Sequence, residues 1–181
     1  ELGENADAVA AARQARELNP QDPRALEVLA QAQLAAGDMN AAISSYNTLT
    51  VMQPKSVSAH LQLANAYAAN GDLREAVGTA RRALQINPGS ADAHAMLGTL
   101  YLRSRRLKDA QEMAAFLQKN APNSPHGFLL EGEIQAAQQD FGRSLAAFQK
   151  AESLESNAYT RIKVHEVQTL LQDRKSTRLN S

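Results

Sequence analysis

The chain has 181 residues and no cysteine, and its 19 Lys and Arg residues balance 19 Asp and Glu residues. A neutral chain lacks the basic field that non-specific nucleic-acid binding requires, and the absence of cysteine excludes disulfides and thiolate metal sites. The hydrophobic content of 44% is too high for a disordered tail, yet no stretch approaches the ~20 apolar residues of a membrane-spanning helix.

The predicted elements are separated by regularly spaced prolines. Pro20, Pro54, Pro88 and Pro122 are each 34 residues apart. A proline cannot continue a helix, because its ring clashes with the preceding turn and it has no N–H to donate. A fixed period of this length is typical of a repeat protein, in which every unit has the same elements.

In chain order, the first predicted helix covers about residues 4–18 and ends before Pro20. Asp22, placed before Pro23, is a typical N-cap of the next helix. Ser90 and Ser124 occupy the corresponding position in later units and are also predicted to be N-caps.

The unit at 57–88 is the clearest example of the repeat. Its segments at about 57–70 and 73–86 carry apolar residues at the i, i+3, i+4 and i+7 spacing of an amphipathic helix. Gly71 between them can adopt the positive φ that ends a helix. Asp72 is then placed to accept a backbone N–H as the N-cap of the second helix.

The repeat register divides the chain into units. We predict a repeat array over residues 1–172, with a partial repeat at 1–20, full repeats at 23–54, 57–88, 91–122 and 125–156, and a partial repeat at 159–172. Residues 173–181 fit no repeat position and are predicted to form a disordered tail. Since neither end has a polar capping helix, we expect a fragment of a longer array whose terminal helices could self-associate end to end.

Small residues recur where two helices of a unit would touch. Counting each proline as position 32, position 8 is Ala30, Ala64, Gly98 and Gly132, and position 20 is Ala8, Ala42, Ala76, Ala110 and Ser144. Position 15 is glycine in the first three units, whereas the later units have Arg105 and Gln139 there. Ser156 occupies the position where the next proline of the series would be. We expect these departures to weaken the later turns without changing the register.

A 34-residue helix–turn–helix unit with these small residues, an aromatic residue at position 11 (Tyr67, Tyr101) and a terminal proline resembles the tetratricopeptide repeat. The resemblance implies an all-α fold, a right-handed superhelical solenoid of antiparallel helix pairs that acts as a non-catalytic protein-binding scaffold. The stretches "ARRALQINPGSADAHAMLGTLYLR" and "SLAAFQKA" are similar to tetratricopeptide proteins of the bacterial PEP-CTERM/exosortase systems, which are associated with exopolysaccharide export. That similarity implies a periplasmic or envelope-anchored location, with a cytoplasmic one left open.

In this family, positions 2, 5, 9, 12 and 13 of each first helix face a concave groove. The resemblance therefore implies that an extended or helical segment of a partner protein contacts Arg24, Glu27, Gln31, Ser58, Leu61, Asn65, Asp92, Ala95, Thr99, Leu102, Arg103, His126, Leu129 and Glu133. None of these residues is aromatic, which argues against a carbohydrate-binding groove. The alternative is a structural spacer that binds nothing.

Residues that could carry chemistry have simpler explanations. His60 and His94 both occupy position 4, where they are metal ligands or, as we favour, packing residues, since a zinc site normally needs three or more protein ligands. Glu131 and Glu133 are two residues apart on a predicted helix and do not face each other. We predict no catalytic residue, metal or cofactor.

The segment "LRSRRLKD" concentrates Arg103, Arg105, Arg106 and Lys108. One interpretation is that these cations form an anion-binding patch. The interpretation that we favour is that they lie in the last turn of a helix and the turn after it, where the helix dipole stabilises positive charge. We predict no nucleic-acid partner.

Overall fold

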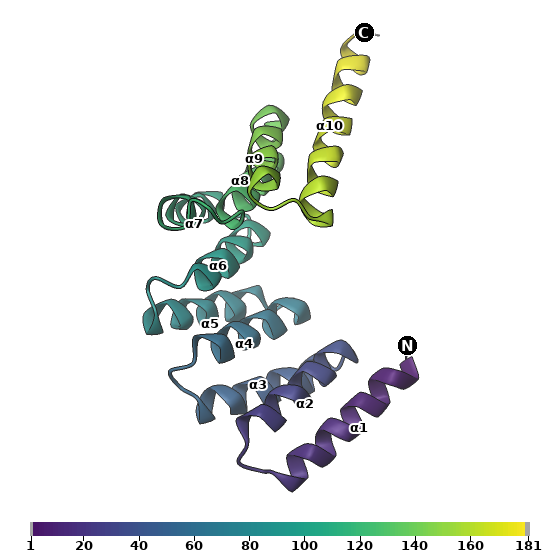
Figure 1. Cartoon of the computed structure of the whole chain (residues 1–181), viewed down its shortest axis with the longest axis vertical. Helices are drawn as coiled ribbons and strands as arrows, with labels where there is room; N and C mark the ends of the chain where they lie inside the picture. Colours follow the sequence, from purple (N-terminus) through teal and green to yellow (C-terminus); the bar gives the residue numbers. More distant parts are fainter. Residues whose placement is uncertain (1, 180–181) are drawn as a thin grey trace. The chain divides into compact units, whose positions relative to one another are not determined.

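The computed structural model describes residues 2–179, and side chains from residue 5 to 173. This part of the chain contains ten α-helices and no strand (Figure 1). The helices are α1 (Leu2–Leu18), α2 (Pro23–Ala35), α3 (Met39–Met52), α4 (Val57–Asn70), α5 (Leu73–Ile86), α6 (Ala91–Arg103), α7 (Leu107–Asn120), α8 (His126–Ala137), α9 (Phe141–Leu154) and α10 (Ala158–Leu179).

The chain divides into two compact units, Glu1–Ala93 (unit 1) and His94–Ser181 (unit 2), with the boundary inside α6. In unit 1 each of the helices α1 to α5 packs against the next one along the chain (Figure 1). In unit 2 the same holds for α7 to α10. The predicted all-helical architecture of adjacent helix pairs is confirmed.

The prolines end helices where the spacing predicts. Helices α3, α5 and α7 each stop two residues before a proline of the series, at Met52, Ile86 and Asn120. Helix α9 ends at Leu154 although Ser156 replaces the proline. There the next helix is fixed from its own start, because Thr160 N–H donates to Asn157 Oδ1 at 3.0 Å and Asn157 N–H donates to Thr160 Oγ1 at 3.0 Å.

Two of the predicted N-caps form as expected. Asp22 accepts from Arg24 N–H at 2.9 Å with Pro23 at the first helical position, and Ser90 Oγ accepts from Ala93 N–H at 3.2 Å.

The other two caps differ from the prediction. Asp72 is the N-cap of α5, but its carboxylate accepts from Asn70 Nδ2 at 2.7 Å and makes no capping bond. The N-cap of α8 is Pro125, one residue after Ser124. Ser124 Oγ lies 2.7 Å from His126 Nδ1 and accepts only a long hydrogen bond, of 3.5 Å, from His126 N–H. In both cases a neighbouring polar side chain competes with the backbone for the capping group.

The turns inside the helix pairs keep one geometry despite the changes at position 15. Gly37 and Gly71 have φ of 80° and 91°, and Arg105 and Gln139 adopt the same left-handed region with φ of 57° and 62°. A side chain with a Cβ is strained there by ~1–2 kcal/mol. The register is unchanged, as predicted, and the strain gives the expected weakening a physical cause.

Small residues form the contact between paired helices. Ala30, Ala42 and Ala76 are fully buried. At Gly132 an added Cβ would lie 2.6 Å from Phe148 Cε1, so only glycine fits under that ring. Ser144, the departure at position 20, is also fully buried, and its hydroxyl donates to Gly132 O at 2.8 Å.

Helix α10 continues to Leu179 and so enters the segment at residues 173–181 that was predicted to be a disordered tail. Residues 180–181 lie outside the described part of the chain. The segment after Ala158 contains neither proline nor glycine, so nothing local ends the helix once it has begun.

Candidate partner-binding surface

Unit 2 has a pocket of about 140 Å³ built from three successive first helices, and we call it the first-helix pocket. Helix α6 contributes Ala95 and Thr99, and α10 contributes Tyr159; the α8 residues are His126, Leu129, Leu130 and Glu133. Five of these seven residues belong to the set predicted to contact a partner. The 34-residue register therefore brings residues far apart in the sequence onto one face.

Polar groups surround an apolar floor in the first-helix pocket. Tyr159 Oη donates to Glu133 Oε1 at 2.6 Å, which joins α10 to α8. Tyr159 is 46% exposed, and the partial burial of its ring, followed by the hydrogen bond and the charge of Glu133, raises the pKa of Tyr159 above its ordinary value. The phenol therefore keeps its proton at neutral pH and stays a donor to the carboxylate.

Leu129 has a second role that the sequence did not reveal. Its side chain is half-buried and packs against the core cluster of Phe148, Val164 and Val167. A polar substitution there would damage the fold as well as the pocket, so Thr99, which is exposed, is the better position for testing binding.

In unit 1 the predicted contact residues lie on α2 and α4. Arg24, Gln31, Ser58 and Asn65 are exposed and Leu61 is half-buried. Glu27 Oε1 accepts from Gln62 Nε2 at 2.5 Å, which links the two helices, so Glu27 is already engaged.

The remaining predicted contact residues lie on α6. Asp92 and Arg103 are exposed, and Leu102 is half-buried. Leu102 and Arg103 are not among the residues that line the first-helix pocket.

Tyr159 and Leu130 are pocket residues that the sequence analysis missed. Tyr159 occupies position 1 of its unit, immediately before the first position assigned to the groove. Tyr159 lines the pocket because its hydroxyl reaches Glu133 on α8 and donates a hydrogen bond to it. Tyr159 thus adds an aromatic side chain beside the predicted contact positions, none of which is itself aromatic.

The two histidines at position 4 are packing residues. His60 is buried and its Nδ1 lies 2.9 Å from Ser56 O, whereas His94 is buried and stacks on Phe116 with a ring-centroid distance of 3.6 Å. Among the described side chains, no three His, Asp or Glu residues cluster as metal ligands would.

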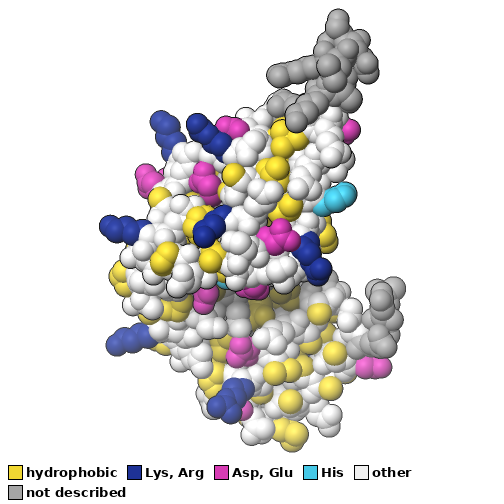
Figure 2. Space-filling view, turned by 45° about the horizontal axis from the view of Figure 1, so that its top comes forward, with side chains coloured by type: hydrophobic (Ala, Val, Ile, Leu, Met, Phe, Trp, Pro, Cys, Tyr) yellow, Lys and Arg dark blue, Asp and Glu magenta, His cyan; other side chains and the backbone are white. Residues whose placement is uncertain are grey.

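In the cationic segment, Arg106 makes structural contacts. Arg106 pairs with Asp109 at 2.9 Å, and its guanidinium lies over the Tyr101 ring at 4.4 Å from the centroid. On the face drawn in Figure 2, the coloured Lys and Arg side chains are separated and interspersed with Asp and Glu. This surface lacks the continuous positive charge that nucleic-acid binding requires.

Glu131 and Glu133 have different partners. Glu131 Oε1 accepts from Gln135 Nε2 at 2.5 Å, along its own helix, and Glu133 accepts from Tyr159. The two carboxylates thus do not form a couple, as their spacing predicts.

Sequence models described as the tetratricopeptide repeat match residues 1–56, 29–91 and 67–134. The chain belongs to the tetratricopeptide repeat family. Its fold is similar to that of TTC0263, a thermophilic TPR protein of Thermus thermophilus, with a TM-score of 0.78 and 24% identity over 93% of this chain and 92% of that one.

Other solved structures agree with this fold. MamA from Desulfovibrio magneticus RS-1 (residue 41 to the end) has a TM-score of 0.66 and 19% identity over 85% of this chain and 88% of that one. YrrB, described as a TPR protein with an unusual peptide-binding site, has a TM-score of 0.65 and 15% identity, covering 91% and 84%. A search of curated proteins finds no match. In the described part of this tetratricopeptide chain, no helix is both long enough and apolar enough to span a membrane.

Proposed function

We propose that this tetratricopeptide array is a protein-interaction scaffold that holds a peptide segment of a partner against its first helices. The observation that carries the proposal is the first-helix pocket, where α6 and α8 both present residues of register positions 5 and 9 to one cavity and α10 adds Tyr159. Its leucine floor suits an apolar side chain of the partner. Its threonine, histidine and glutamate suit the polar backbone of an extended or helical segment.

A display library of random peptides selected on the full chain tests this proposal. The selected peptide would be labelled with fluorescein and its affinity measured by anisotropy. Replacing Thr99 with arginine fills the pocket, and we expect it to weaken binding about tenfold, a loss of ~1.4 kcal/mol.

Thr169→Arg is a matched control. Thr99 and Thr169 are both exposed, and each donates to the carbonyl four residues earlier, at 3.1 Å to Ala95 O and 3.0 Å to His165 O. Only Thr99 lines the pocket. Equal affinities of the Thr99→Arg variant and the wild type would contradict the assignment. A loss of the same size in both variants would point to non-specific charge.

The setting of this function stays a prediction. A bacterial envelope assembly for exopolysaccharide or protein sorting is supported only by the likeness of residues 80–103 and 144–151 to that branch of the family. End-to-end self-association is supported by the exposed Ile162 and Leu170 on α10, which are 54% and 44% accessible. Sedimentation at two concentrations tests it, and a strictly monomeric chain would contradict it.

A further inference from the structure

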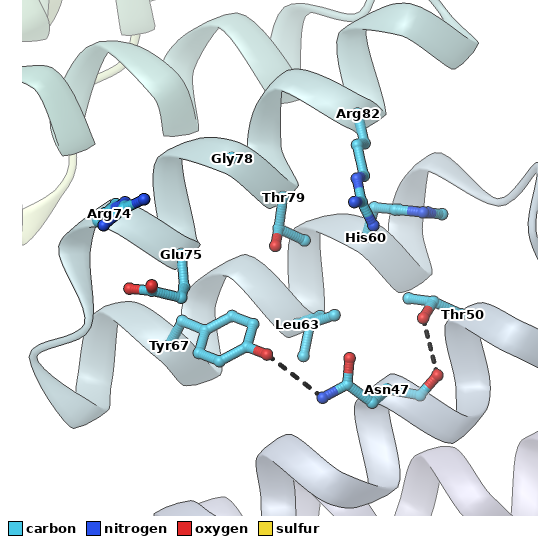
Figure 3. A pocket seen from close by; sticks show the side chains of 10 residues that line it. All are labelled: Asn47, Thr50, His60, Leu63, Tyr67, Arg74, Glu75, Gly78, Thr79 and Arg82. Carbon is cyan, nitrogen blue, oxygen red and sulfur yellow. Dashed lines mark hydrogen bonds between the residues drawn. The ribbon is translucent and has the colours of Figure 1, made fainter.

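A second cavity lies in unit 1, and none of the predicted contact residues lines it. It is a polar groove of about 350 Å³ with walls from the second helices α3 and α5 and a floor from α4 (Figure 3). We call it the second-helix groove. The proposed function does not use this groove, because none of the groove's lining residues is among the residues predicted to contact a partner.

Gly78, in the middle of α5, is the feature that requires an explanation. Glycine inside a helix costs ~1 kcal/mol relative to alanine. At Gly98 and Gly132 close packing accounts for that cost, since an added Cβ would collide with Leu130 or Phe148. At Gly78 an added Cβ meets nothing within 4 Å, and φ is not positive.

Neither packing nor backbone conformation therefore accounts for Gly78. Since it lines the second-helix groove, a side chain there would project into the cavity. Glycine at such a place lets the backbone of a bound ligand approach the helix closely.

Two arginines line the same wall. Arg74 and Arg82 are both exposed, and neither forms an ion pair among the side chains described for residues 5–173. They are eight residues apart on α5, which places their Cα atoms ~12 Å apart along the axis. Figure 3 shows Arg74 at one end of the groove and Arg82 at the other, with Thr79 between them.

Between the arginines the groove offers hydrogen-bonding groups of both kinds. Asn47 Nδ2 donates to Tyr67 Oη at 3.3 Å, so the asparagine oxygen remains an acceptor and the tyrosine hydroxyl a donor. Thr79 is only 8% exposed, and its hydroxyl makes no hydrogen bond in the described structure. A peptide backbone presents the complementary C=O and N–H groups.

We propose that the second-helix groove binds an extended peptide segment with two carboxylate side chains about four residues apart. An extended chain advances ~3.3 Å per residue, so four residues span ~13 Å and match the arginine separation. Arginine binds carboxylates through paired, charge-assisted hydrogen bonds. Gly78 leaves room for the segment's backbone midway between the two pairs.

A peptide fits this groove better than a nucleic acid does. Glu75 lines the wall beside Arg74 and repels anions. This repulsion disfavours a nucleic acid, which carries a charge at every nucleotide, more than a peptide with two carboxylates, whose backbone N–H Glu75 can accept. The aromatic rings that line the groove are those of Tyr67 and His60, and His60 is buried with its Nδ1 2.9 Å from Ser56 O. Successive bases would therefore lack a row of exposed stacking partners.

The test uses the full chain and a fluorescein-labelled octapeptide of glycine and serine with glutamate at its second and sixth positions. A peptide with glutamine at both positions is the matched probe. We expect the glutamate peptide to bind about tenfold more tightly than the glutamine peptide. We also expect Arg74→Gln and Arg82→Gln each to weaken its binding several-fold.

Blocking the groove gives the decisive comparison. Gly78→Leu places a side chain in the cavity, so we expect it to abolish peptide binding, while the improved helix propensity keeps the chain folded. The control is Gly142→Leu in α9, where an added Cβ meets only Asp140 Oδ1, at 3.7 Å. Circular dichroism and a urea midpoint check that both variants fold.

The proposal is overturned if the glutamate peptide fails to bind at about 1 mM, if both peptides bind equally, or if Gly78→Leu binds like the wild type. Tighter binding of a single-stranded RNA octamer, lost in Gly78→Leu, would assign the groove to nucleic acid and also overturn it. Thr99→Arg should leave this binding unchanged, and Gly78→Leu should not affect the first-helix pocket. The two sites can therefore fail independently.

Discussion

Replacing Arg105 with glycine should stabilise the protein. Arg105 is exposed and has a φ of 57° in the turn between α6 and α7. Its N–H donates to Leu102 O at 3.0 Å and the next N–H donates to Tyr101 O at 2.8 Å. The turn at Gly71 has the same pair of bonds, at 3.2 and 2.9 Å, so the backbone already has the conformation that glycine prefers.

The expected gain follows from two opposing effects. Removing the Cβ relieves ~1–2 kcal/mol of left-handed strain. Glycine also increases the entropy of the unfolded chain, which costs ~0.4–1 kcal/mol. With the middle of each range, the net stabilisation of Arg105→Gly is ~0.8 kcal/mol, or ~2–3 °C in Tm for a chain of this length.

Urea and thermal unfolding of Arg105→Gly and Arg105→Ala measure the effect. The alanine variant removes the same charge and the long side chain but keeps the Cβ, so it should gain nothing from relief of strain. Equal stabilisation of both variants would show that charge, and not the Cβ, is responsible. A glycine variant that is no more stable than the wild type would refute the reasoning.

Three further predictions concern local features. Ala76 is fully buried, so Ala76→Leu should overpack the helix pair and destabilise it by ~1–3 kcal/mol; an unchanged urea midpoint would contradict the assigned register. Asp38 Oδ1 accepts from Ala41 N–H at 3.1 Å, whereas Asp72 makes no capping bond. Asp38→Ala should therefore lower the free energy of unfolding by ~1 kcal/mol, and Asp72→Ala should lower it by less. Equal losses of stability in the two variants would contradict this difference. The pKa of Tyr159 is raised in the folded chain by burial and by Glu133; the resulting stability is therefore fully present below the ordinary tyrosine pKa and is lost as pH rises through the folded value. Glu133→Gln should shift the alkaline absorbance titration of Tyr159 to lower pH. An unshifted curve would show that the Glu133 carboxylate does not raise the pKa of Tyr159.

The helix boundaries could be predicted because their determinants are local. The segments predicted at 57–70 and 73–86 are α4 and α5 as observed. Proline, a capping side chain and apolar spacing act within one or two turns, so they can be read without knowing what packs nearby. At Asp72 the boundary is as predicted and only the capping bond is absent, because the carboxylate accepts from Asn70 Nδ2. After residue 172, where no stop signal is present, α10 continues to Leu179.

The binding surfaces depend on distances between helices, which the sequence does not encode locally. The register predicted that Thr99 and Glu133 share a face, but only the packing of α10 against α9 brought Tyr159 to Glu133.

Glycines that look alike in the sequence also have different surroundings. Gly98 and Gly132 are each covered by a leucine or phenylalanine, whereas Gly78 opens onto a groove. Arg105 and Gln139 have a positive φ, which is unfavourable for a residue with a Cβ. The helices on both sides of each turn impose it, because their own contacts already hold them in place. The sequence by itself determined the repeat, its register and the ends of its helices, while the tertiary structure decided which side chains meet, because those meetings depend on how closely neighbouring helices approach.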